Sequence, residues 1–286
     1  MGALLDLRHL GRARVIASYL LAGDELALVD CGPASCVGAL RAGLREHGLG
    51  TGDLRHLVLT HIHLDHAGAA GTLVREQPDL LVHVSQIGAP HLVDPSRLER
   101  SARRLYGEDF DRLWGELVPV PAANVRVLGD VVLGLEAFPT PGHASHHVSF
   151  LADDGTCYSG DATGVRIVPA QHIAPVAPPP DIDVEAWNRT LDAVEARRPA
   201  RLCLPHFGVV EEVEEHLVRM RARLAAWAAR VREGASEEEF VRAAEEELRA
   251  EADPGSAGSY TQAGPFWQSY AGLRRYWEKH AERAAV

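Results

Sequence analysis

The chain has 286 residues, of which 46% are hydrophobic and 24% charged, a composition typical of folded globular proteins and not of disordered ones. Its 40 acidic and 29 basic residues give a formal net charge of −11, which disfavours a nucleic-acid partner held by phosphate contacts. Lys279 is the only lysine, so a lysine-dependent Schiff base or phosphate-binding loop is excluded from the body of the chain. Histidine, by contrast, occurs 15 times.

The first third of the sequence predicts strands that alternate with helices. In chain order we expect strands at 15–21 and 26–30, a helix at 34–47, a strand at 57–59, a helix after Gly68 and a strand at 80–84. Turn residues between the first two strands indicate a hairpin, and Gly48 and Gly50 end the first helix. The following segment, 95–116, is predicted to be helical and is rich in arginine.

The middle of the chain returns to strands and ends in a helical region. We expect strands at 125–128, 131–138, 147–151 and 156–159, a proline-rich loop, a helix from Asp183 to about 198 and a strand at 202–204. Two passes of strands mixed with helices indicate an α/β (α+β) chain with sheets in the middle and helices outside. Beyond about 208 the apolar residues recur at helical spacing, and Ser236 with Glu239 predicts a capping box.

Neither a membrane segment nor a disulfide scaffold is predicted. The apolar run at 15–21 is too short to cross a bilayer, and no later segment reaches 18 apolar residues. Four cysteines, none in a Cys-x-x-Cys pair, are interpreted as buried small hydrophobic residues. We therefore expect a cytoplasmic protein without a membrane partner.

A dense group of imidazoles directly follows the apolar strand at 57–59. His61, His63, Asp65 and His66 fall within six residues, and the first two leave an extended backbone on the same face. A helix that starts there would turn Asp65 and His66 back toward the first pair. Imidazole nitrogen and carboxylate oxygen suit zinc, iron or manganese, and so many titratable groups beside a buried strand are costly without a cation. The sequence therefore predicts a metal site here.

Three further donors follow other predicted strands. They are His143 in Pro141-Gly142-His143, Asp161 in Ser159-Gly160-Asp161 and His206 in Pro205-His206-Phe207-Gly208. In each case an apolar strand runs into a small or rigid residue and then a donor. We expect Gly142 to allow a close approach of the backbone. His146, His147 and His172 are left open between a place in the cleft and a structural role.

This set of seven donors, in this order, resembles the metallo-β-lactamase superfamily, and most of all its glyoxalase II-like hydrolases. The resemblance covers about residues 15–210 and implies an αββα sandwich with a C-terminal helical extension. It implies a first metal on His61, His63 and His143, a second on Asp65, His66 and His206, and Asp161 as the bridge. It also implies that Asp30 orients a ligand. We therefore predict a catalytic domain over 1–210 and a helical region over 211–286 packed on it.

The resemblance implies hydrolysis of a small thioester, ester or lactone by a hydroxide shared between two divalent ions, with zinc expected and iron or manganese as alternatives. Asp65 is expected to steer the hydroxide as well as to bind metal. The alternatives are hydrolysis of a small phosphodiester, persulfide dioxygenation at a single iron and a non-catalytic metal-binding scaffold. Retention of Asp65, His66 and His206 argues against a single iron. The helical region is expected to shape the substrate pocket or to form a homodimer contact.

Overall fold

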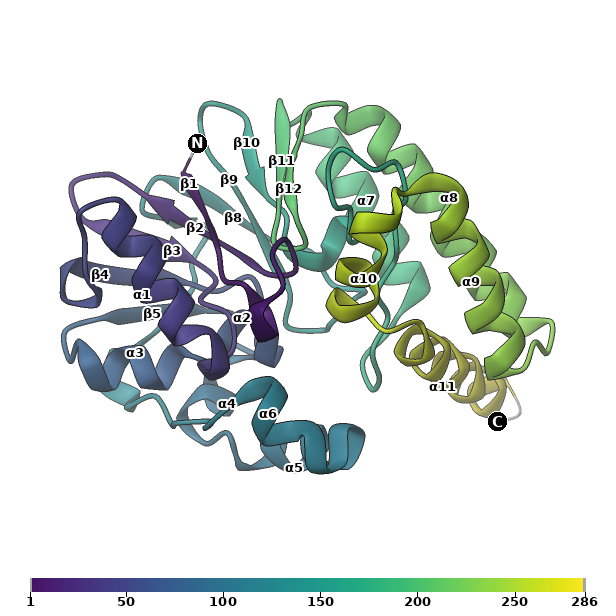
Figure 1. The fold of residues 1–286 in the computed structure, drawn as a ribbon, viewed down its shortest axis with the longest axis horizontal. Coiled ribbons are helices and arrows are strands. Elements are labelled where there is room, and N and C mark those ends of the chain that lie inside the picture. Colours follow the sequence, from purple (N-terminus) through teal and green to yellow (C-terminus); the bar gives the residue numbers. More distant parts are fainter. Residues whose placement is uncertain (1, 285–286) are drawn as a thin grey trace. The chain divides into compact units, whose positions relative to one another are not determined.

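The computed structural model (Figure 1) describes residues 2–284. By its internal contacts the chain divides into two compact units. Unit 1 comprises Met1–Phe138 and Phe150–Asp154, and unit 2 comprises Pro139–Ser149 and Gly155–Val286. The helices beyond residue 210 share unit 2 with the segment that precedes them. A boundary between a catalytic domain and a helical region at residue 210 stays a prediction.

Unit 1 contains a six-stranded sheet with the strand order β1-β2-β3-β4-β5-β6. The strands are β1 Ala3–Asp6, β2 Ala17–Leu21, β3 Leu26–Val29, β4 Leu54–Val58, β5 Leu81–Val84 and β6 Val125–Val127. The first three pair antiparallel, whereas β3 to β6 are parallel. Leu57 and Val58 of β4 are fully buried, as expected for a central parallel strand with both faces covered. Because β3 and β4 are parallel neighbours, the residues after both strands lie at one edge of the sheet.

The helices of unit 1 are mostly short. They are α1 Val37–Glu46, α2 Leu64–Ala67, α3 Ala70–Glu76, α4 Ala89–Val93, α5 Ser96–Tyr106 and α6 Phe110–Trp114. Helix α2 begins after His63, whose extended backbone marks the end of the segment that leaves β4. The predicted turn of helix that carries Asp65 and His66 is therefore confirmed. A small apolar cluster around Leu64 includes Phe110, Tyr106 and Trp114.

The second six-stranded sheet has the order β12-β11-β10-β9-β8-β7. Its strands are β7 Val131–Val132, β8 Leu135–Pro139, β9 Val148–Leu151, β10 Thr156–Tyr158, β11 Arg201–Leu204 and β12 Gly208–Val210. The prediction of one strand over 131–138 is wrong, because Leu133 and Gly134 take φ values of 50° and 76° and turn the chain into the β7–β8 hairpin. The chain is a mixed α/β protein with two sheets, as predicted.

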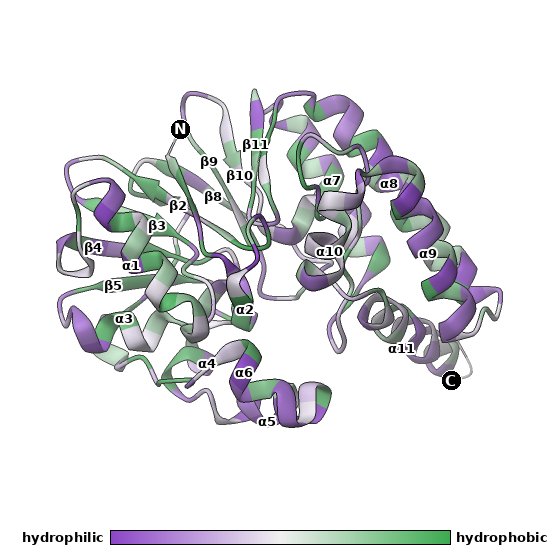
Figure 2. Ribbon diagram, viewed as in Figure 1, coloured by the Kyte–Doolittle hydropathy of each residue, from purple (hydrophilic) through white to green (hydrophobic). Residues whose placement is uncertain are grey.

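Unit 2 also contains α7 Val184–Ala196 and the four C-terminal helices α8 Val213–Arg232, α9 Glu237–Glu251, α10 Pro254–Ala263 and α11 Phe266–Ala284. Hydrophilic and hydrophobic segments alternate along α8 and α9 (Figure 2). The apolar side covers a core in which the Trp227 ring lies 5.2 Å from that of Phe240 and 5.7 Å from that of Phe266. The Ser236 capping box is confirmed. None of the helices among residues 2–284 is both long and apolar enough to span a membrane.

Candidate metal centre

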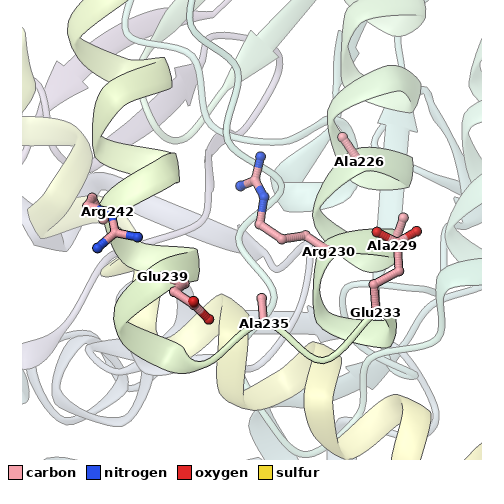
Figure 3. Close-up of a pocket in the computed structure, with 7 residues that line it drawn as sticks. All are labelled: Ala226, Ala229, Arg230, Glu233, Ala235, Glu239 and Arg242. Atoms are coloured by element: carbon pink, nitrogen blue, oxygen red, sulfur yellow. The ribbon is translucent and has the colours of Figure 1, made fainter.

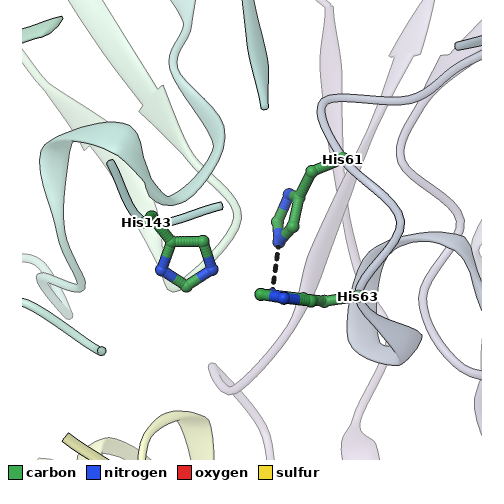
Figure 4. A group of neighbouring side chains, drawn as sticks. All are labelled: His61, His63 and His143. Carbon is green, nitrogen blue, oxygen red and sulfur yellow. Dashed lines mark hydrogen bonds between the residues drawn. The ribbon is translucent and has the colours of Figure 1, made fainter. Parts of the chain in front are cut away.

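Four of the predicted donors lie in unit 1, at the carboxyl end of β4. His61 and His63 leave the extended segment after this strand, and Asp65 and His66 lie in α2. His61 and His66 are fully buried, whereas the Asp65 side chain is 19% exposed. His61 Nε2 lies 3.1 Å from His63 Nδ1, so the two imidazoles do share a face (Figure 4). His66 Nε2 lies 3.7 Å from Asp65 Oδ2.

Asp30 organises these histidines from the end of β3. Its Oδ1 accepts a hydrogen bond from the Thr60 backbone N–H, and its Oδ2 accepts one from the Thr60 hydroxyl, both at 2.8 Å. The same Oδ2 lies 2.8 Å from His66 Nδ1, and Thr60 Oγ1 lies 3.0 Å from His61 Nδ1. Because the carboxylate only accepts and the Thr60 hydroxyl already donates, Nδ1 of both rings carries the proton. Nε2 of His61 and of His66 therefore presents a lone pair, the form that binds a metal.

A nearby thiol does not add to this donor set. Cys31 is fully buried, and burial, together with the adjacent charge of Asp30, raises the pKa of its thiol well above the usual range. Its Sγ lies 3.3 Å from the His66 carbonyl oxygen and donates to it. All four cysteines are buried, in agreement with the interpretation from sequence.

The other three predicted donors lie in unit 2. His143 follows β8, Asp161 lies in the short 3-10 helix Gly160–Thr163 after β10, and His206 follows β11. Strands β10 and β11 are parallel, so Asp161 and His206 leave the sheet at the same edge. The Gly142 backbone has a φ of 136°, and a Cβ there would stand 2.3 Å from the Trp187 Cα atom. The close backbone approach predicted at this glycine is confirmed.

The two carboxylate oxygens of Asp161 face different histidines. Oδ2 lies 3.4 Å from His143 Nε2, and Oδ1 lies 3.6 Å from His206 Nε2. All three side chains are at least 95% buried, with relative exposures of 1%, 5% and 1%. His143 Nδ1 donates to the Val176 carbonyl oxygen at 2.7 Å, which leaves Nε2 with its lone pair directed toward Asp161.

The donor spacings in both units fit metal coordination. Two donors bound to one ion at about 2.0 to 2.2 Å, with an angle of about 95° to 120° between them, lie roughly 3.0 to 3.8 Å apart. The four intra-unit distances are 3.1, 3.4, 3.6 and 3.7 Å. Imidazole and carboxylate are also the donors that zinc and iron take in proteins. The residues present therefore fit divalent metal ions in chemistry and in spacing.

Several residues that hold Asp161 were not identified from the sequence. The Asp161 backbone N–H donates to His147 Nε2 at 3.1 Å, and His147 Nδ1 in turn donates to Thr140 Oγ1 at 2.7 Å. Trp187 Nε1 donates to the Ala162 carbonyl oxygen at 2.7 Å. The role of His147, left open by the sequence, is thus to position Asp161.

His216 and His172, both fully buried, lie elsewhere in unit 2. His216 Nε2 donates to the Thr163 carbonyl oxygen at 2.8 Å, so helix α8 also supports the Asp161 segment. His172 Nδ1 lies 3.1 Å from Glu251 Oε2. Burial lowers the pKa of each imidazole to about 4. Both are neutral near pH 7 and act as structural hydrogen-bonding groups.

A surface cavity of about 510 Å³ lies between α8 and α9 (Figure 3). Its charged lining consists of Arg230, Glu233, Glu239 and Arg242, with the sides completed by alanines. None of the predicted donors lines this cavity. Both signs of charge are present, and Arg230 is already paired with Glu247, so the cavity does not add to the metal centre.

Comparisons with known proteins agree on one family. The profile of the metallo-beta-lactamase superfamily matches residues 11–206. The metallo-beta-lactamase fold-containing protein ST1585 of Sulfurisphaera tokodaii is 25% identical over 218 residues, which are 72% of this chain and 78% of that protein. The structure of the metallo-beta-lactamase family protein TTHA1429 of Thermus thermophilus superposes with a TM-score of 0.69 at 22% identity, covering 99% of this chain and 94% of that one. TTHA1623, solved in a di-iron-bound form, gives a TM-score of 0.53 at 23% identity, covering 73% and 93%.

Proposed function

Because the chain belongs to the metallo-β-lactamase superfamily, we propose that it is a binuclear metal-dependent hydrolase of a small thioester, ester or lactone. From the order of the seven donors in the sequence, the proposed ligands are His61, His63 and His143 for one ion, Asp65, His66 and His206 for the other, and Asp161 as the bridge. Zinc is the proposed metal. Iron is a specific alternative, since the related fold TTHA1623 is described in a di-iron-bound form.

The observation that carries this proposal is the orientation of Asp161. Its Oδ2 faces His143 at 3.4 Å and its Oδ1 faces His206 at 3.6 Å, and these two histidines belong to different proposed ligand sets. This arrangement supports Asp161 as the residue that both sets would share. The backbone bond to His147 and the carbonyl bond of Trp187 hold the segment in that orientation.

The chemistry of hydrolysis is divided between the metals and the protein. When bound, two divalent ions supply a Lewis acid for the carbonyl oxygen of the substrate and an acidified water molecule. The protein directs the lone pairs of its imidazoles through Asp30, Thr60 and the Val176 carbonyl. Asp65 is the more exposed proposed carboxylate ligand, at 19% against 5% for Asp161, which supports the proposal that it steers the attacking hydroxide as well as binding metal.

The proposed function is tested by elemental analysis joined to a substrate panel. The purified protein is assayed as isolated and after addition of zinc, manganese or iron, with p-nitrophenyl esters, thioesters, lactones and bis-p-nitrophenyl phosphate. We expect two metal ions per chain and turnover of the carbonyl substrates. Preference for the phosphodiester would favour the alternative hydrolase. A protein that binds no metal and stays inert would refute both.

A matched pair of variants assigns the activity to the site. Asp161→Asn removes the bridging charge, and we expect loss of at least one ion and a fall in kcat/KM of about 100-fold or more. Asp153→Asn makes the same chemical change at an exposed residue of unit 1 and should leave metal content and rate unchanged. Two bound ions and full activity in the Asp161 variant would contradict the bridging role.

A further inference from the structure

The segment that accepts the proton of His143 is held by a side chain from the last helix. Val176, whose carbonyl oxygen accepts from His143 Nδ1 at 2.7 Å, lies in the irregular stretch between Asp161 and α7. Ser269 of α11 is fully buried and bonds to both neighbours of Val176. Its Oγ accepts from the Ala177 N–H at 3.1 Å and donates to the Pro175 carbonyl oxygen at 3.4 Å.

The backbone of α11, and that of Gly264 just before it, pack closely on this stretch. A Cβ at Gly272 would stand 1.9 Å from the Ala177 carbonyl oxygen, and one at Gly264 would stand 2.2 Å from a methyl carbon of Val176. The start of the stretch is held in a similar way by α10. There the Tyr260 hydroxyl accepts from the Ile167 N–H at 2.9 Å and donates to the His172 carbonyl oxygen at 2.7 Å.

These contacts bear on the chemical state of His143. A neutral imidazole has its proton on one nitrogen, and the partner of that nitrogen decides which one. The Val176 carbonyl only accepts, so it selects the tautomer with Nδ1–H and a bare Nε2. If the peptide groups on both sides of Val176 move, the carbonyl moves with them and this selection weakens.

We propose that Ser269, through the peptide groups that flank Val176, is a positioning residue for the metal ligand His143. The C-terminal helices thereby serve the metal centre at a distance in sequence, in addition to closing the core of unit 2. The assignment rests on the proposed function only in taking His143 as a ligand. The tautomer of His143 is measurable in the metal-free protein, whatever the substrate.

The test compares four forms of the full-length protein: wild type, Ser269→Ala, Ser269→Thr and Tyr276→Phe. Tyr276 lies in the same helix, and its hydroxyl donates to Glu185 of α7 instead of to the Val176 stretch. Its phenylalanine variant therefore loosens α11 without touching the carbonyl. Long-range ¹H–¹⁵N spectra of histidine-labelled protein report the His143 tautomer, and competition with a chelator reports zinc affinity.

We expect wild type to hold His143 with Nδ1–H and Ser269→Ala to show a mixture of tautomers. Zinc affinity should fall about 10-fold in Ser269→Ala, the low end for residues that orient a ligand. Ser269→Thr retains the hydroxyl and should restore both readings, and Tyr276→Phe should match wild type. An unchanged tautomer in Ser269→Ala, or an equal loss of affinity in Tyr276→Phe, would overturn the assignment. If no form binds zinc, the proposed function fails, while the tautomer spectra still decide the role of Ser269.

Discussion

Replacement of Asp30 by asparagine tests how the unit 1 histidines are held. Asp30 is 3% exposed and accepts three hydrogen bonds at 2.8 Å, two from Thr60 and one from His66 Nδ1. Its backbone φ is 55°, a conformation that asparagine tolerates as well as aspartate does. The substitution therefore changes the hydrogen bonding with little change in shape.

An asparagine at this position cannot satisfy the same partners. If the amide nitrogen takes the place of Oδ2, it faces the Nδ1–H of His66. If the side chain is flipped, the amide nitrogen takes the place of Oδ1 and faces the backbone N–H of Thr60. Either orientation sets a donor against a donor and loses at least one bond to a charged group, worth about 1.5 to 3 kcal/mol. We expect the free energy of unfolding to fall by about 2 kcal/mol. If His66 instead moves its proton to Nε2, its lone pair is lost to the metal, and we expect zinc affinity to fall about 10- to 100-fold.

Urea denaturation of the metal-free protein, followed by circular dichroism, measures the stability, and competition with a chelator measures the zinc affinity. Asp6→Asn is the matched control, because both carboxylate oxygens of Asp6 also accept hydrogen bonds, from the backbone N–H of Arg8 at 3.0 Å and of Arg14 at 2.9 Å, but none comes from a predicted metal ligand. It should lower stability and leave zinc affinity unchanged. A wild-type affinity in Asp30→Asn, or an equal loss in Asp6→Asn, would refute this account of the tautomers.

Three further predictions concern stability and reactivity. Burial lowers the pKa of His172 to about 4, so below about pH 6.5 the unfolded chain takes up a proton that the folded chain does not. As the pH falls from about 6.5 to 4, the free energy of unfolding should therefore decrease, by at most about 1.4 kcal/mol per pH unit from this group. In His172→Gln, the urea denaturation curves at pH 7 and at pH 5 should differ less than they do in the wild type. Gly71→Ala places a Cβ 1.9 Å from the Val118 carbonyl oxygen and should cost about 1 to 3 kcal/mol in thermal unfolding, whereas Gly38→Ala, with nothing within 4 Å, should not destabilise the protein. The four buried cysteines should react with a thiol reagent only after denaturation, and rapid labelling of the native protein would contradict their burial.

The places of the candidate donors in the fold were predictable because each follows a strand end that the sequence marks clearly. Apolar runs stop at Thr60 and at Ser159, and parallel pairing then brings such ends to one edge of a sheet. The hairpin at Leu133 was missed because a left-handed φ at leucine is set by the surrounding fold and has no signal in an apolar run. Strand β1 and helix α10 were missed for a related reason. Strand β1 has only four residues, and α10 contains Gly255 and Gly258, which lower its helix propensity, so packing against neighbours outweighs a weak local signal in both.

Which nitrogen of each imidazole carries the proton could not be predicted from neighbouring residues in the sequence. Asp30 and His66 are 36 residues apart, His143 and Val176 are 33 apart, and Ser269 lies 94 residues from Pro175. A ligand is recognisable because its own side chain is chemically distinctive. The partner of that side chain can be any acceptor that the fold supplies. Here the acceptor is a carboxylate for His66, a hydroxyl for His61 and a peptide carbonyl for His143. Every residue has a backbone carbonyl group, so the sequence does not indicate which carbonyl accepts from a given histidine. The residue that orients this carbonyl must therefore be found from the structure. For His143 that residue is a serine in the last helix, which no spacing rule would connect with a metal ligand.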